Sequence, residues 1–109
     1  MNHEPLSNIE QEILEELIAL TYKVPCNKES LARRLNMLSL TRLRVFLHWH
    51  QRQCAEYIEV TRPIWTAWEN DTHRPNPLKL RNFLIHVLNV HYSRLSHFVA
   101  FPTHRAKAQ

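Results

Sequence analysis

Apolar periodicity and helix caps together predict an all-α protein. Apolar residues recur every three or four positions in several separate stretches, which is typical of amphipathic helices. Ser, Thr, Asn or Pro stands at the start of these stretches, where such residues cap or begin a helix. Of the 109 residues, 44% are hydrophobic, which is enough for one core. None is glycine, so any left-handed backbone position must be occupied by Asn, Asp, Glu or His.

Two helices are expected between residues 8 and 36. The first begins at Ser7 or Asn8 and runs to about Tyr22, with apolar residues at helical spacing and glutamates between them. The second begins near Asn27 and ends near residue 36, while residues 1–7 are expected to be loose.

The apolar face of the first helix is wide for a protein of this size. We therefore interpret residues 1–37 as an N-terminal helical extension. Within it, residues 8–24 would serve as an arm for homodimerisation or for binding a protein partner.

Residues 42–75 predict three short helices in quick succession. The first ends near Trp49 and the second spans residues 51–58. Thr61 is a good cap for the third, and Pro63 follows in the first turn, where its missing N–H costs nothing. A short capped helix that follows another across a tight turn is the pattern of a helix-turn-helix.

Several residues of this stretch occur at fixed spacings, namely Arg44, Gln51, Cys54, Ala55, Ile58, Thr61, Trp65, Trp68, Glu69, Asn70 and Pro75. In this register the stretch resembles the DNA-binding domains of the phage-repressor or Xre-type family. The resemblance covers roughly residues 40–96. Cys54 and Trp65 stand where the family has Leu and Ile, and Glu59 and Asp71 stand where it has glycine.

The resemblance implies a repressor-like, five-helix DNA-binding domain over residues 38–101. It also implies an ion pair between Arg44 and Glu69, which would join the helix before the motif to the end of the recognition helix. Arg62 would be the one long donor on the face toward the major groove, where arginine reads guanine. The expected DNA-binding residues are Gln51, Arg52, Thr61, Arg62, Pro63, Thr66, Ala67, Asn70, Arg74 and Lys79, with Arg81 as a further phosphate contact.

The C-terminal part predicts two more helices and a tail. Pro77 begins a helix that runs to about Asn89, and a last short helix carries Leu95 and Phe98. Residues 102–109 are basic, which predicts a disordered tail.

Residues 28–49 permit a second interpretation, as a small helix-turn-helix of the winged-helix type. Its second helix would be Leu40–Trp49. No strand-rich wing follows in the sequence.

Charge is distributed unevenly along the chain. Residues 1–24 hold five Glu against one Lys, a net charge of −4, whereas residues 25–109 hold 13 basic and 5 acidic residues, a net charge of +8. An acidic arm and a basic body suggest that the body faces nucleic acid. Neither a membrane-spanning run nor a signal peptide is evident, so we expect a cytoplasmic protein.

The eight histidines and two cysteines match no metal-binding spacing, and no catalytic motif is present. We expect no enzymatic activity, no metal and no cofactor. The predicted function is sequence-specific binding of double-stranded DNA in transcriptional regulation, as a homodimer on a two-fold site. The alternative is a protein-interaction module, antitoxin-like or a co-regulator subunit, built on a degenerate helix-turn-helix.

Overall fold

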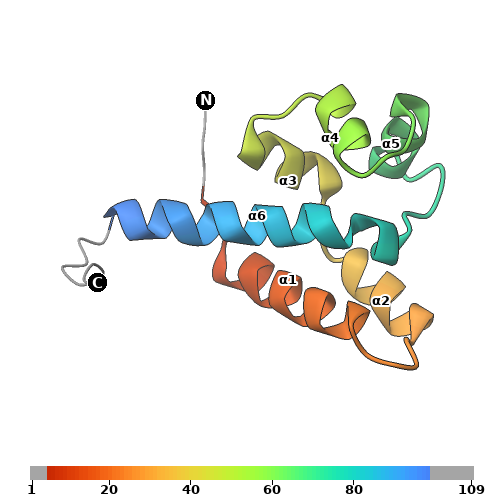
Figure 1. Cartoon of the computed structure of the whole chain (residues 1–109), viewed down its shortest axis with the longest axis horizontal. Helices are drawn as coiled ribbons and strands as arrows, with labels where there is room; N and C mark the ends of the chain where they lie inside the picture. Colours follow the sequence, from red (N-terminus) through yellow and green to blue (C-terminus); the bar gives the residue numbers. More distant parts are fainter. Residues whose placement is uncertain (1–4, 99–109) are drawn as a thin grey trace.

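The structure, a computed structural model, describes residues 5–98, with side chains through Leu95. Within this range the chain forms six α-helices and no strand (Figure 1), which confirms the all-α prediction. The predicted tail, residues 102–109, lies outside the described residues. The helices are α1 Asn8–Thr21, α2 Lys28–Leu35, α3 Leu40–Leu47, α4 Gln51–Tyr57, α5 Arg62–Glu69 and α6 Pro77–Phe98.

Polar caps fix the starts of several helices. Ser7 caps α1 reciprocally: the Glu10 N–H donates to Ser7 Oγ at 3.1 Å, and the Ser7 N–H donates to Glu10 Oε1 at 2.8 Å. Asn27 and Thr61 cap α2 and α5 in the same sense, each accepting from a backbone N–H three residues on. The expectation of a loose segment before α1 is wrong for residues 5–7, because Leu6 is only 5% exposed and belongs to the core.

α6 is one uninterrupted helix, so the prediction of a break after Asn89 and a separate last helix is wrong. Its buried face continues past that point from Val87 to His91, which is 3% exposed. His91 Nε2 lies 2.9 Å from Gln11 Oε1 of α1, and this partner keeps the polar segment helical. The described part of residues 38–101 therefore holds four helices where five were predicted.

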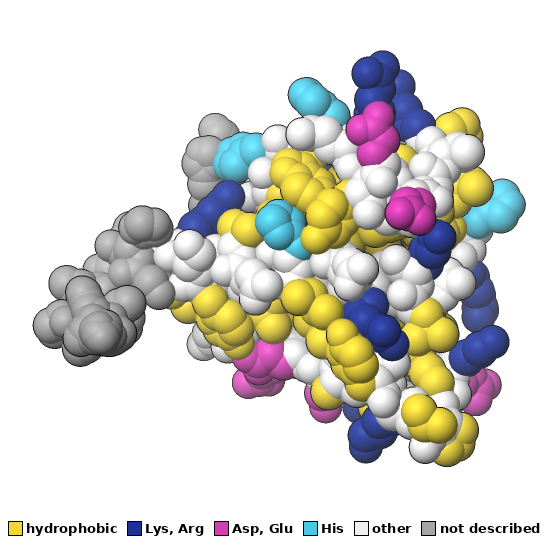
Figure 2. All heavy atoms as spheres, viewed as in Figure 1, with side chains coloured by type: hydrophobic (Ala, Val, Ile, Leu, Met, Phe, Trp, Pro, Cys, Tyr) yellow, Lys and Arg dark blue, Asp and Glu magenta, His cyan; other side chains and the backbone are white. Residues whose placement is uncertain are grey.

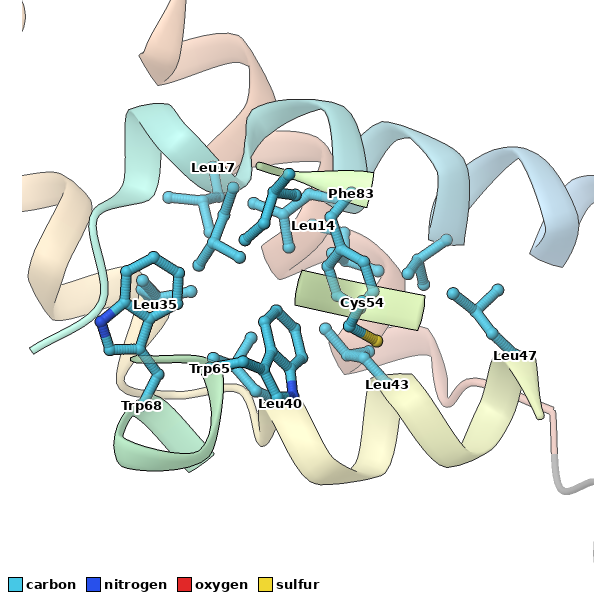
Figure 3. Close-up of a cluster of buried hydrophobic side chains, with 14 of the residues drawn as sticks. Leu14, Leu17, Leu35, Leu40, Leu43, Leu47, Cys54, Trp65, Trp68 and Phe83 are labelled. Carbon is cyan, nitrogen blue, oxygen red and sulfur yellow. The ribbon is translucent and has the colours of Figure 1, made fainter. Parts of the chain in front are cut away.

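α6 lies at the centre of the molecule, with α1 and α2 on one side and α3, α4 and α5 on the other (Figure 1). Both sides contribute to one core. Leu14 and Leu17 of α1 belong to the same cluster as Leu43 of α3, Trp65 of α5 and Phe83 of α6 (Figure 3). All five are fully buried.

The apolar face that suggested a partner arm in residues 8–24 is therefore largely buried by the chain's own packing. Ile13, Leu14 and Leu17 lie in the interior, and Ile18 packs against the core. The winged-helix interpretation requires strands after residue 49, and the described residues contain none.

Three non-glycine residues adopt the left-handed conformation. They are His48, Glu59 and Asp71, with φ angles of 62°, 63° and 63°. Glu59 lies between α4 and α5, and Asp71 follows α5. These two occupy the positions where the resemblance expects glycine, so each turn forms despite the steric conflict of its Cβ atom.

Within residues 5–98, no helix has both the length and the apolar character needed to cross a bilayer.

Candidate nucleic-acid interface

The carboxylate of Glu69, the last residue of α5, joins three helices. The Glu69 side chain is 4% exposed and forms an ion pair with Arg44 of α3. Arg44 Nε lies 2.6 Å from Glu69 Oε2, and Arg44 Nη2 lies 3.4 Å from Oε1. Arg44 also donates from Nη1 to the Trp49 carbonyl at 3.0 Å. The expected pair is thus present, and its arginine also anchors the link between α3 and α4.

Three further donors complete the surroundings of this carboxylate. Thr41 Oγ1 and Gln51 Nε2 each donate to Glu69 Oε1 at 3.0 Å, and Trp65 Nε1 donates to Oε2. Burial alone would raise the pKa of Glu69, but these hydrogen bonds and the one from Arg44 lower it below 4.5. Glu69 is therefore held as an anion, and it fixes α3, α4 and α5 relative to one another.

Beside this network, exposed residues of α5 line a surface hollow, which we call the α5 face. Arg62, Pro63 and Asn70 are exposed, and Thr66 and Ala67 are half-buried. Trp65 and Trp68 turn the opposite way, into the core (Figure 3). The hollow is lined by Gln51, Arg62, Pro63, Thr66, Ala67, Asn70 and Thr72, all but the last of which were predicted to contact DNA.

A second hollow adjoins the α5 face, and three arginines are among the residues that line it. It is lined by Arg44, His50, Gln51, Arg52, Gln53 and Arg62. Gln51 and Arg62 line both hollows, so the two form one continuous surface across the start of α4 and the start of α5. Among the residues that the structure describes, no acidic side chain lines either hollow, and this surface therefore suits an anionic ligand.

Gln51 was expected to donate freely to DNA from the start of α4, but its amide is already bound at both ends. Its Nε2 donates to Glu69, and its Oε1 accepts from Thr66 Oγ1 at 3.2 Å. An amide nitrogen carries two hydrogens, so one donor remains for a ligand. The position of that donor is set by Glu69 and Thr66.

Other predicted residues lie away from the α5 face. Thr61 uses its hydroxyl to cap α5, accepting from the Ile64 N–H at 3.4 Å. Arg74 lines a neighbouring hollow with Ile64 and Trp68 and is not among the residues that line the α5 face. Lys79 is exposed in the first turn of α6.

Arg81, expected as a further phosphate contact, is instead bound to α1. Its Nε donates to Thr21 Oγ1 at 2.9 Å, and its guanidinium lies 4.0 Å from the centroid of the Tyr22 ring. Arg81 therefore links α6 to α1 and does not belong to the α5 face.

The sequence interpretation missed several residues of this site. Thr41 and Trp65 donate to Glu69, and His50 and Thr72 line the two hollows. Only Trp65 carried a signal, because it stands where the family that the sequence resembles has Ile, and it brings an indole N–H that a buried position must satisfy.

No family model, curated protein or solved structure matches the chain. Among the described residues, no three His, Cys, Asp or Glu side chains are grouped so that they could hold a metal ion.

Proposed function

We propose that α4 and α5 form a helix-turn-helix and that the protein is a sequence-specific DNA-binding transcriptional regulator. The observation that carries this proposal is the α5 face. It combines one exposed arginine with small side chains on a helix that a buried carboxylate holds in place. A helix that enters the major groove must present short side chains, because bulky ones would keep its axis away from the bases.

Each residue of the α5 face has a distinct role in this proposal. Arg62 lies in the first turn and reads guanine through O6 and N7. Pro63, Ala67 and the methyl group of Thr66 contact thymine methyl groups. Asn70 and Arg52 contact phosphates on either side and set the register of the helix on the duplex.

The Glu69 network supports this proposal by keeping the reading side chains in place. Thr66 donates to Gln51, and Gln51 donates to Glu69, so two residues of the α5 face are connected to the buried ion pair. Side chains whose rotamers are fixed by neighbours bind with less loss of conformational entropy.

The test is a salt series of duplex binding by wild type and Arg62→Ala. We expect the substitution to weaken the preferred site by about 1–3 kcal/mol and a scrambled duplex by less. The matched control is Arg33→Ala, which removes the same charge from an exposed position on α2, across α6 from the α5 face. Equal loss on both duplexes would make Arg62 a phosphate contact. Equal behaviour of Arg62→Ala and Arg33→Ala would contradict the proposal.

A protein-interaction module is the second candidate, and one surface favours it. A largely apolar hollow adjoins the α5 face and shares Pro63 and Ala67 with it. In this hollow Ile64 is 44% exposed beside Trp68 and Arg74. If this hollow is the functional one, Ile64→Ser abolishes activity in cells, whereas Arg62→Ala leaves it intact. The reverse result supports DNA binding.

A further inference from the structure

α6 carries a second apolar stripe outside its buried face. Leu78, Tyr92 and Leu95 are 40%, 39% and 39% exposed, and Ile85 and Leu88 are half-buried. Leu78, Ile85 and Tyr92 follow one another at intervals of seven residues, as do Leu88 and Leu95. A seven-residue apolar repeat is the pattern by which one helix packs along another.

Four of the five stripe residues lie outside the core of one chain, whereas Leu88 also packs against that core. The face of α6 that enters the core is formed by Leu80, Phe83, Leu84, Val87 and His91. The stripe lies beside it, toward α1. In the view of Figure 2, hydrophobic side chains follow α6 and α1 across the lower half of the molecule, with single charged side chains between them.

The order of residues along the stripe makes it complementary to itself. Leu78 and Leu95 lie equally far from the midpoint between His86 and Val87, and the same holds for Ile85 and Leu88. When a second α6 packs antiparallel about a two-fold axis at this midpoint, Leu78 faces Leu95 and Ile85 faces Leu88. Each contact then occurs twice, as in an isologous interface.

Two polar residues on the same face of α6 fit the same symmetry. Arg81 and Tyr92 are also equally far from the midpoint, and Tyr92 donates from its hydroxyl to Glu15 of α1. The two-fold axis therefore brings Arg81 of one copy toward Glu15 of the other. Among the described residues, neither Arg81 nor Glu15 forms an ion pair within its own chain. Arg81 has N–H donors left after its bonds to Thr21, since a guanidinium carries five.

We propose that this stripe is the interface of a homodimer in which two α6 helices pack antiparallel, with Arg81 of each copy paired to Glu15 of the other. The occupant is a second copy of this chain because both the apolar spacing and the charges match under a two-fold rotation. The inference concerns self-association and does not depend on DNA binding.

Sedimentation equilibrium of the full chain tests the interface. Wild type is expected to approach twice the chain mass of 13.1 kDa as its concentration rises. Glu15→Lys and Arg81→Glu each place like charges across the interface, and each is expected to weaken dimerisation by about tenfold or more. In an equimolar mixture of the two variants, the introduced lysine of one chain meets the introduced glutamate of the other. The native Arg81 of the first variant then meets the native Glu15 of the second. The mixture should therefore dimerise like wild type.

Recovery on mixing distinguishes this interface from a contact within one chain, which mixing does not restore. Arg81→Glu also removes the bonds to Thr21, so circular dichroism must first show that the variant is folded. If it is not, the double variant Leu78→Ser/Leu95→Ser takes its place and should also weaken dimerisation by about tenfold or more. The matched control is Met37→Ser, which removes an apolar side chain that is 61% exposed away from the stripe. A wild type that stays monomeric at all concentrations overturns the proposal. So does a mixture of the two charge variants that stays monomeric, or loss of dimerisation that is equal in Met37→Ser.

Discussion

The two sides of α6 are held together by different interactions. On the side of α3, α4 and α5, the buried Glu69 carboxylate accepts hydrogen bonds from all three helices. The Trp65 ring also packs edge-on against the Phe83 ring of α6, with the ring centroids 5.2 Å apart. On the side of α1 and α2, leucines are buried, and single polar bonds such as Arg81–Thr21 and His91–Gln11 join α1 to α6.

Because of this difference, substitutions on the two sides are expected to change the stability of the fold in different ways. A leucine interface loses stability in proportion to the apolar area removed, so its losses are graded. A buried ion pair responds much more strongly to the loss of one partner, because the other charge stays buried without compensation. Three kinds of variant test this comparison. They delete α1, break the Glu69 network on the other side of α6, or change the turn between α4 and α5.

Removal of residues 1–24 should have the largest effect. The deletion takes away Leu14 and Leu17 together with Ile13, and exposes the part of α6 that they cover. Each such leucine contributes about 2–5 kcal/mol, so the total is comparable to the roughly 5–15 kcal/mol of a whole domain. We expect no cooperative thermal transition by circular dichroism. A sharp transition in the truncated protein would show that the α3–α5 side and α6 fold without α1.

Glu69→Ala should destabilise the fold by about 3–5 kcal/mol, since it leaves Arg44 partly buried without its anion. The double change Arg44→Met/Glu69→Leu should recover part of this loss, because two apolar side chains leave no unpaired charge. Urea titration measures both. The matched control is Glu56→Ala, at an exposed position of α4, which should change stability by less than about 0.5 kcal/mol. A melt of Glu69→Ala like that of the control would remove the distinction between the two sides.

The network was predicted only in part, for a physical reason. The spacing between Arg44 and Glu69 resembles that of a helix-turn-helix family, so the ion pair was expected, and Thr61 and Pro63 marked the start of α5. The donors Thr41 and Gln51 reach Glu69 across 28 and 18 residues of sequence, and no periodic pattern encodes such contacts.

The break predicted in α6 was wrong because tertiary contacts outweigh the local sequence preferences on which the prediction rested. Asn89 and the residues after it look like a helix end when only local preferences are considered. His91 and Tyr92 are held in the helix by Gln11 and Glu15, which lie 80 and 77 residues away in the sequence. A tertiary partner thus overrides a weak local signal.

Acid should affect the α1 side before the Glu69 network. Burial of His91 beside α1 lowers its pKa from the ordinary value of 6.5, while Glu10 and Glu15 partly oppose this. The unfolded chain therefore binds a proton first, so this contribution to stability is complete above pH 6.5 and declines as the pH falls below it.

The contribution of Glu69 is complete above pH 4.5 and declines only below that value, because its folded pKa is lowered. Urea titrations across about pH 7 to 4 measure both phases. His91→Gln keeps a polar group for Gln11 and should remove the first decline, leaving the second. If His91→Gln shows the same pH profile as wild type, His91 does not set the acid response of the α1 side.

The smallest expected effect is a gain in folding stability. Glu59 adopts a left-handed conformation between α4 and α5, with φ of 63°. Glycine has no Cβ and accepts this conformation readily, so Glu59→Gly should stabilise the protein by about 0.5–1 kcal/mol despite the added freedom of the unfolded chain. Glu56→Gly, within α4, should instead destabilise by about 1 kcal/mol. Thermal melts that rank these two variants in the reverse order would contradict the role given to the turn.

The pairing of α1 with α6 also determines when the protein can fold during synthesis. α1 leaves the ribosome first, yet Gln11 meets His91 only after 80 further residues have been made. Until then, Leu14 and Leu17 remain without the helix that covers them. The α3–α5 side has its main contacts within a shorter span, and chains are made at about 5–20 residues per second. We expect the Glu69 network to assemble before α1 docks, so the nascent chain exposes an apolar helix for several seconds, the period in which a chaperone would protect it.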